Sequence, residues 1–287
     1  MATVDKLKKD LAKKEEGMKE IQDPFKALVN SSGIKKRFED MLDKEAPSFI
    51  TTLLSLKQDK LQGVDSMSIL GSAFKAASLK LPVDPNLGYA WIIPFNNTVN
   101  GHKVKQAQFQ IGYKGYIQLA QRSGQYLRLN VTEIYEGQFI SYNSLTEELL
   151  LDMDNQTSDA VIGYAAYFKL VNGFEKTVYW NKEKVSKHAK RFSKSFNNGP
   201  WQSDFDAMAK KTVLKHALST WGILSVEMRN AQSSDSAVIS VDNEGNEKRV
   251  LKENEIEAEY TIDTETGEIV DDTDYTGTPF EKEPVNE

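Results

Sequence analysis

Basic side chains and aromatic rings alternate through the middle of this chain. The 48 residues from Pro85 to Thr132 contain no aspartate or glutamate, and their cations are interleaved with seven tyrosine, tryptophan and phenylalanine rings. Cations follow the phosphates of a single-stranded nucleic acid and rings stack on its bases, so the window favours such a ligand. The alternative is that the rings form the core of a sheet and that the absence of acidic residues is due to chance. The candidate binding residues in this window are Lys103, Lys105, Lys114, Arg122 and Arg128.

Three glutamines add an uncharged polar row to the same window. From Gln106 to Ile111 they alternate with apolar residues, and the period of two of a strand places the amides on one face. Such a row either contacts phosphates, sugars or bases, or simply faces solvent. Gln108 and Gln110 are therefore further candidates for binding.

Three predicted helices each carry cations on one face. The first follows the Gly112-Tyr-Lys-Gly115 turn, ends at Gly124 and places Lys114 and Arg122 opposite an apolar face. The second lies near residues 182–195 after a capping Asn181, and the third spans residues 203–220. A row of lysines along a helix either faces solvent or binds phosphate. In these helices, few glutamates lie nearby to balance the positive charge. The candidates here are Lys190, Arg191, Lys194, Trp201, Lys210, Lys211 and Lys215.

Two acids before the third helix permit a different chemistry. Together with Asp84, the carboxylates of Asp204 and Asp206 could bind a divalent metal, as in a nuclease. Acids directly after Ser203 also fit a helix N-terminus, which we favour. The chain has no cysteine and its three histidines are scattered, so we expect neither a metal site nor catalytic residues. It lacks the Gly-x-x-x-x-Gly-Lys-Ser/Thr loop that cradles a triphosphate, so we expect no nucleotide cofactor and disfavour an ATP-driven recombinase.

The net charge of −6 averages two unlike segments. Residues 1–230 carry 32 basic and 25 acidic side chains, whereas residues 231–287 carry 4 and 17. The second segment is also poor in apolar residues. It can therefore bury too little apolar surface to offset the conformational entropy lost on ordering. We therefore expect an N-terminal helix in residues 1–30, a core in residues 31–230 and a disordered acidic tail in residues 231–287.

The N-terminal segment is amphipathic. Apolar residues at spacings of three and four from Val4 to Ile21 predict a helix that packs on the core or on a neighbouring subunit, where it would promote oligomerisation. No apolar run reaches the about 18 residues of a membrane span, and the lysine-rich start lacks a signal-peptide core. We expect a cytosolic protein without a membrane partner.

The core is predicted to be α+β. Helices are expected around Ile34–Leu42, Phe49–Leu56 and Ile69–Ala77, the last capped by Asp65 or Ser66. Runs of β-prone residues on either side of Asn100-Gly101 predict a hairpin in which Pro94 marks a bulge or an edge strand. Further strands are expected at residues 127–135, 160–170 and 175–180. The prediction is a helical N-terminal part followed by a central antiparallel sheet with packed helices.

Three separated motifs resemble the RecT family of phage single-strand annealing proteins and, more distantly, the lambda Red-beta type. They are Leu81-Pro-Val-Asp-Pro85 with Ile93-Pro-Phe95, the run from Gln110 to Gly124, and the run from Trp201 to Lys215. The likeness covers about residues 34–230. One departure is Trp221-Gly-Ile-Leu-Ser225, where the family often has a proline before Leu-Ser.

The resemblance implies a recombinase that needs no ATP. Such a protein coats single-stranded DNA, anneals it to a complementary strand and forms rings or helical filaments on the DNA. The resemblance also implies a phage exonuclease and the host single-strand binding protein as partners in the bacterial cytosol. It places Lys114, Arg122, Lys210, Lys211 and Lys215 in the DNA groove. Two alternatives stay open, namely the metal-dependent nuclease and a structural oligomer whose basic surfaces only balance acidic neighbours.

Overall fold

The computed structural model describes residues 24–99, 102–193, 196–197, 200–223, 225–252, 261–262 and 269–270. The chain divides into two compact units, residues 1–253 and 254–287. In the second unit the described residues form one short antiparallel pair, β10 (Thr261–Ile262) with β11 (Ile269–Val270). Residues 1–23 of the predicted N-terminal helix and residues 253–260, 263–268 and 271–287 of the predicted tail lie outside the described residues.

The described part of the first unit begins with four helices. α2 (Pro24–Val29), α3 (Ser32–Leu42), α4 (Ala46–Asp59) and α5 (Ser66–Ser78) follow one another, with a 3-10 turn (Asp43–Glu45) before α4. Each helix buries an apolar face, and Phe38 of α3 stacks on Phe74 of α5 with ring centroids 4.6 Å apart. Asp65 caps α5 by accepting a hydrogen bond from the Ser68 N–H at 2.8 Å, which confirms the predicted helix start.

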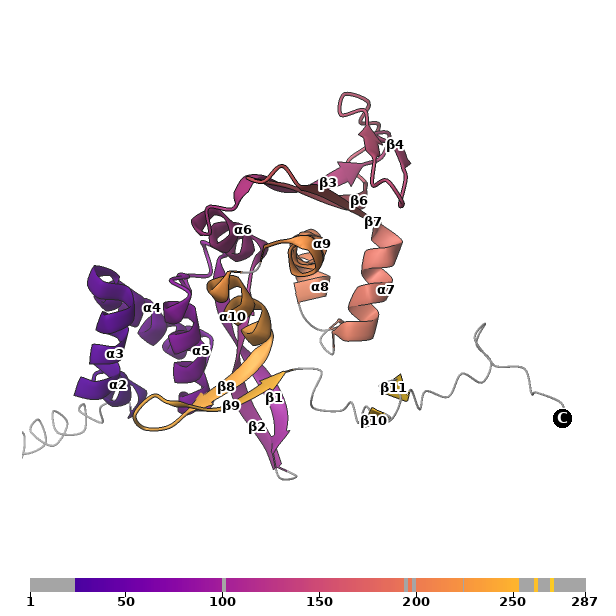
Figure 1. Ribbon diagram of the computed structural model, residues 1–287. Coiled ribbons are helices and arrows are strands. Elements are labelled where there is room, and N and C mark those ends of the chain that lie inside the picture. The colour runs from indigo at the N-terminus through magenta and orange to yellow at the C-terminus, as the bar shows by residue number, and fades with distance from the viewer. Residues whose placement is uncertain are drawn as a thin grey trace, which may run out of the picture. The chain divides into compact units, whose positions relative to one another are not determined.

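A four-stranded antiparallel sheet packs against α5 (Figure 1). Its order is β1 (Ala90–Val99), β2 (His102–Ile111), β8 (Ala237–Val241) and β9 (Glu247–Lys252). β1 and β2 form the predicted hairpin, and Pro94 lies on the edge strand β1, a position suited to a residue without a backbone N–H. The helix and sheet approach so closely that a Cβ on Gly71 would lie 2.1 Å from the Ile239 carbonyl oxygen.

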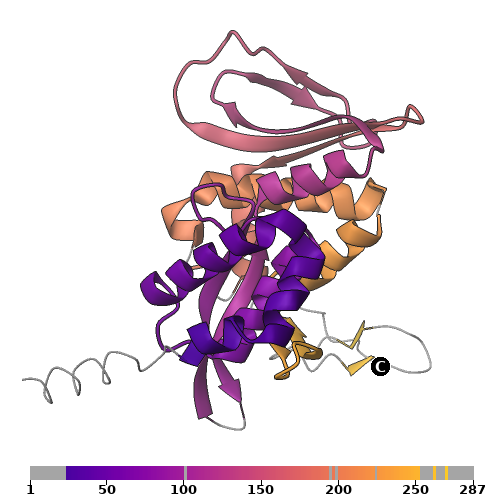
Figure 2. The same ribbon diagram turned by 90° about the vertical axis from the view of Figure 1, so that its left-hand side faces the viewer.

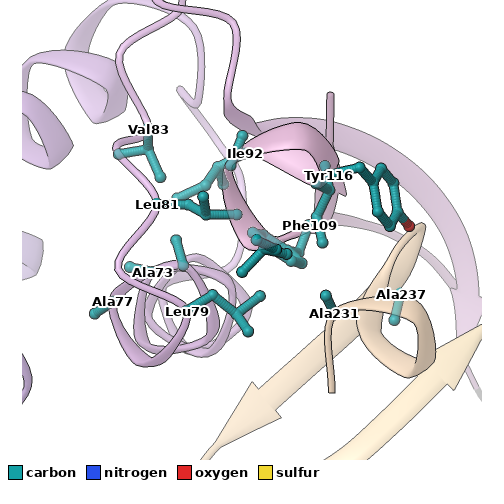
Figure 3. Close-up of a cluster of buried hydrophobic side chains, with 14 of the residues drawn as sticks. Ala73, Ala77, Leu79, Leu81, Val83, Ile92, Phe109, Tyr116, Ala231 and Ala237 are labelled. Carbon is teal, nitrogen blue, oxygen red and sulfur yellow. The ribbon is translucent and has the colours of Figure 1, made fainter. Parts of the chain in front are cut away.

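The tail boundary predicted at residue 231 is wrong. α10 (Val226–Ser234), β8 and β9 belong to the first unit, and Figure 3 shows Ala231 and Ala237 in the same buried cluster as Phe109. Although acids surround it, β8 is apolar enough to pair with β2 and to cover α5. The acidic segment that remains, residues 253–287, carries 13 acidic side chains and one basic.

A three-stranded antiparallel sheet positions the basic helices. β3 (Tyr126–Tyr135), β6 (Val161–Leu170) and β7 (Glu175–Asn181) pair in that order, and β4 (Phe139–Tyr142) pairs with β5 (Leu149–Leu151) in a hairpin that was not predicted. Figures 1 and 2 show this sheet at one end of the first unit and the tip of the β1–β2 hairpin at the other.

Three helices carry the side chains of interest onto this sheet. α9 (Phe205–Trp221), which follows the short α8 (Pro200–Ser203), packs on β3, β6 and β7 and against α6 (Tyr113–Arg122). α7 (Lys182–Phe192) packs against β6, β7 and α9. This mixture of helices and antiparallel sheets confirms the α+β class. None of the helices that the structure describes is long and apolar enough to span a membrane.

Candidate nucleic-acid interface

The predicted basic residues fall into separate groups. Lys103 and Lys105 are exposed on β2, Lys114 on α6 and Arg128 on β3, whereas Lys194 lies outside the described residues. The β1–β2 hairpin tip and the β3–β6–β7 sheet are at opposite ends of the first unit (Figures 1 and 2). Of the aromatic residues in the acid-free window, Phe109 and Tyr116 are buried in the core, as in the alternative of a sheet core, and cannot stack on bases.

Arg122 holds two elements together. Its Nη2 donates a hydrogen bond to the Leu79 carbonyl oxygen at 2.5 Å, and its Nη1 lies 3.5 Å from the Lys80 carbonyl oxygen. These carbonyls follow α5, where the negative end of the helix dipole favours a cation. Glu227 of α10 lies 3.5 Å from the same guanidinium. A phosphate would have to compete with these partners.

The glutamine row bonds within the sheet. Gln108 is buried and its Nε2 donates to the Ser236 carbonyl oxygen at 2.9 Å. Gln110 Nε2 donates to Gln108 Oε1 at 2.9 Å, and Gln106 Oε1 accepts from Asn97 Nδ2 at 3.0 Å. The amides therefore bond to one another, to β1 and to the residue before β8, rather than to solvent or a ligand.

The lysines of α9 have carboxylate partners, although few glutamates lie near them in the sequence. Lys210 Nζ lies 2.5 Å from Glu133 Oε1 of β3. Lys211 Nζ lies 2.9 Å from Asp235 Oδ1, and Lys215 Nζ lies 2.7 Å from Asp235 Oδ2. Lys211 is buried, whereas Lys215 keeps 35% of its side chain exposed.

Asp235, the residue after α10, gathers four donors around one buried carboxylate. Besides the two lysines, it accepts hydrogen bonds from the Ile111 N–H at 2.9 Å and the Tyr116 hydroxyl at 3.0 Å. Burial opposes ionisation of Asp235, but Lys211 and Lys215 outweigh it and hold the pKa of the carboxyl well below its ordinary value. Burial and the neighbouring carboxylate raise the pKa of Tyr116. The cluster fastens β2, α6 and α9 to the end of α10.

Trp201 of α8 precedes the two acids at the start of α9. Trp201 is buried and meets Phe205 edge to face with ring centroids 5.3 Å apart. Asp204 accepts a hydrogen bond from the Ala207 N–H at 3.2 Å, which confirms the helix-start interpretation. Asp206 accepts from the Tyr164 hydroxyl at 2.5 Å. In the part of the chain that the structure describes, no three His, Asp or Glu side chains lie together as metal ligands would.

α7 presents its cations to solvent. Asn181 caps the helix by accepting a hydrogen bond from the Lys184 N–H at 2.8 Å, as predicted. Val185 and Ala189 are buried, whereas the five cations Lys182, Lys184, Lys187, Lys190 and Arg191 are exposed. The acid of this helix, Glu183, forms an ion pair with Lys187 at 2.8 Å. The predicted polar face is confirmed, and Phe192 at the end of the helix is 43% exposed.

Aromatic rings from three elements lie beside these cations. Lys184 Nζ is 4.7 Å from the ring centroid of Trp180 in β7, and Arg191 Cζ is 5.2 Å from that of Phe192. Trp180 in turn contacts His188 of α7 and His216 of α9, with centroid separations of 5.1 and 4.9 Å. We call this arrangement the α7 surface; its members are Lys184, Lys187, Lys190, Arg191, Trp180, His188, Phe192 and His216.

Sequence reasoning missed the rings of the α7 surface because they come from β7, α7 and α9. One signal was available: His188 follows Lys184 by four residues, so it lies on the same side of the helix. Asp235 was missed because it was counted among the acids of the tail. The alternating apolar run that follows it, from Ala237 to Val241, could have indicated a strand.

An α+β core that presents a basic helix beside aromatic rings suits a protein that acts on nucleic acid. The RecT family model matches residues 47–257, and the chain belongs to this family. The family assigns the chain to DNA recombination by single-strand annealing. The matched range includes α10, β8 and β9, in agreement with the corrected boundary of the core.

Two relatives illustrate the relationship. The chain is 45% identical over 294 residues to the "Uncharacterized protein YqaK" of Bacillus subtilis (strain 168), an alignment that covers all of this chain and 97% of the relative. It is 30% identical over 214 residues to the "Protein RecT" of Escherichia coli (strain K12), which covers 73% of this chain and 79% of that protein.

Proposed function

We propose that the chain binds single-stranded DNA along the α7 surface and anneals complementary strands without a nucleotide cofactor, as an oligomer on the DNA. Family membership supports the reaction, and the α7 surface is the observation that supports the binding site. The sequence contains no phosphate-cradling Gly-x-x-x-x-Gly-Lys-Ser/Thr loop, which supports annealing without ATP.

The dimensions of the α7 surface suit a single strand. Lys184 and Arg191 are seven residues apart, which is about 10 Å along a helix, so the two cations can reach different phosphates of one strand. The exposed Phe192 beside Arg191 offers a ring to a base, and stacking contributes about 1–3 kcal/mol per base. Positive charge and ring area therefore lie within reach of the same few nucleotides.

The other candidates receive different roles in this proposal. Lys103, Lys105, Lys114 and Arg128 are exposed and would make additional phosphate contacts with a longer strand. Gln108, Gln110, Arg122, Trp201, Lys210 and Lys211 would support the fold around the site through the contacts described above. Residues 1–30 would promote assembly. The proposed partners are a phage exonuclease and the host single-strand binding protein, and the proposed location is the bacterial cytosol.

The test compares two variants of equal charge. Lys184→Ala with Arg191→Ala should weaken binding to an oligonucleotide and lower the salt slope by about 0.7 for each lost phosphate contact. Lys36→Ala with Lys60→Ala removes two exposed cations of α3 and of the residue after α4, and should leave the slope unchanged. Annealing of complementary oligonucleotides without ATP is measured in parallel. Equal slopes for the two variants would remove α7 from the binding site.

The metal-dependent nuclease is not favoured. Asp204 caps α9 and Asp206 accepts a hydrogen bond from Tyr164, so both carboxylates already have structural partners. Cleavage of the oligonucleotides with magnesium or manganese would revive that alternative. A purely structural oligomer would show no salt-dependent binding.

A further inference from the structure

Two histidines on different helices contact the same tryptophan of the α7 surface. His188 lies against Trp180 and also 4.6 Å from the ring centroid of Phe192, while His216 lies against Trp180 and 5.4 Å from Trp221. Both imidazoles are half-buried. Their contacts with protein are made by ring faces and edges, and the described residues offer no hydrogen-bond partner to either pair of ring nitrogens.

The charges that face this pair are positive. Lys184 and Arg191 act on it from α7, Lys176 from β7 and Lys215 from α9. Carboxylates of the packed elements already have partners: Glu183 with Lys187, Glu175 with Lys169 and Asp206 with Tyr164. Glu147 and Asp235 pair with Lys176 and Lys215, respectively. Within the part of the chain that the structure describes, no carboxylate is therefore left to pair with the two histidines.

Burial and then the surrounding cations lower the pKa of both histidines, so the imidazoles are neutral at pH 7 in the free protein. A phosphate at the α7 surface would offset the field of Lys184 and Arg191 and would offer an acceptor to the ring N–H groups. Both effects favour the charged imidazolium.

We propose that His188 and His216 are themselves phosphate-binding residues, which take up protons when single-stranded DNA reaches the α7 surface and so couple DNA affinity to pH. This inference rests on the proposed function. In this inference, the two histidines become cationic in the complex. Their contacts add to those of the permanently charged lysines and arginine.

The direction of the pH dependence follows from linkage. DNA binding raises the pKa of each histidine, so the bound state holds more protons than the free state. Affinity is highest below the free-protein pKa and falls as the pH rises through the pKa of the complex. A rise of one pKa unit corresponds to about tenfold in affinity for each histidine.

The chain offers a matched control for this idea. Its third histidine, His102, is exposed on β2, at the hairpin. Anisotropy of a labelled oligothymidine should show wild type losing affinity by about tenfold or more between pH 6 and pH 8 at constant salt. His188→Gln and His216→Gln should each reduce that dependence, and His102→Gln should keep it.

Calorimetry of wild type provides a readout that needs no variant. Titration of the oligonucleotide in two buffers of different ionisation enthalpy near pH 7 should reveal a net uptake of protons on binding. DNA binding without proton uptake and with equal affinity across this range would overturn the inference and leave the proposed function intact. A loss of pH dependence in His102→Gln as large as in the other two variants would also overturn it. No binding at any pH would overturn the proposed function itself.

Discussion

Asp235→Ala should remove a large part of the folding free energy, because four donors lose their acceptor at once. Lys215 retains 35% of its side-chain exposure and can turn to water, but the Lys211 side chain is only 10% exposed. Breaking a buried ion pair by removing one partner costs about 3–5 kcal/mol, since the other charge stays in an apolar environment. Domains are stable by about 5–15 kcal/mol. We therefore expect a loss of about 3–5 kcal/mol and a marginally folded variant.

Urea denaturation followed by tryptophan fluorescence measures this loss. Lys211→Met added to Asp235→Ala should restore part of the stability, because it removes the buried ammonium that has lost its ion pair with Asp235 while preserving most of the side-chain volume. Glu39→Ala breaks an exposed pair with Lys35 on α3 and serves as the control, with a midpoint close to that of wild type. A loss below about 1 kcal/mol, or a double variant no more stable than Asp235→Ala alone, would refute the reasoning.

The same ion pairs predict a pH profile. Burial opposes ionisation, but Lys211 and Lys215 keep the pKa of Asp235 well below its ordinary value. The stabilisation is thus fully present above the unfolded-state pKa of about 3.9 and is lost as the pH falls toward the folded-state value. The stability difference between wild type and Asp235→Ala should be constant from neutral pH to about 5 and should shrink below about 4.

Three further predictions concern the boundaries and the packing of the core. Truncation after Lys252 should leave a folded protein that binds single-stranded DNA more tightly at low salt, because residues 253–287 carry 13 acids and one base that compete with phosphate; the gain should fade at about 300 mM salt. Equal low-salt affinities of the truncated and full-length proteins would contradict this. Truncation after Asn230 removes β8 and Asp235 and should abolish folding, as measured by circular dichroism. Deletion of residues 1–20 should shorten the assemblies that light scattering detects on DNA, whereas assemblies of wild-type length would assign this segment to packing within one chain. Gly71→Ala should lower the melting temperature by about 4 °C or more, because its Cβ would meet the Ile239 carbonyl oxygen at 2.1 Å, while Gly33→Ala, with no atom within 4 Å of the added Cβ, should not.

Local structure could be predicted where neighbouring residues determine it. The caps at Asp65, Asn181 and Asp204 depend on a side chain and an N–H three residues away, and such contacts are visible in the sequence. The β1–β2 hairpin likewise follows from a turn between two β-prone runs. The exposed stripe of α7 follows from helical periodicity alone.

The partners of the cations could not be predicted in the same way. Tyr116 and Asp235 are 119 residues apart in the sequence, and Lys211 and Asp235 are 24 apart. Spacing within α9 shows that Lys211 and Lys215 share a side of the helix, but not that a carboxylate lies there. The tail boundary failed for a related reason, because an average over residues 231–287 hid the short strand β8 among acids.

The pairing of β2 with β8 also sets an order of events while the chain is being made. Gln108 and its partner Ser236 are separated by 128 residues, which a ribosome adds in about 6–25 s at about 5–20 residues per second. During that interval the inner edge of β2 has no neighbour. An unpaired strand edge invites pairing with other chains. Incomplete chains that stop before β8, more than finished ones, are therefore the form of this protein that is most prone to aggregate.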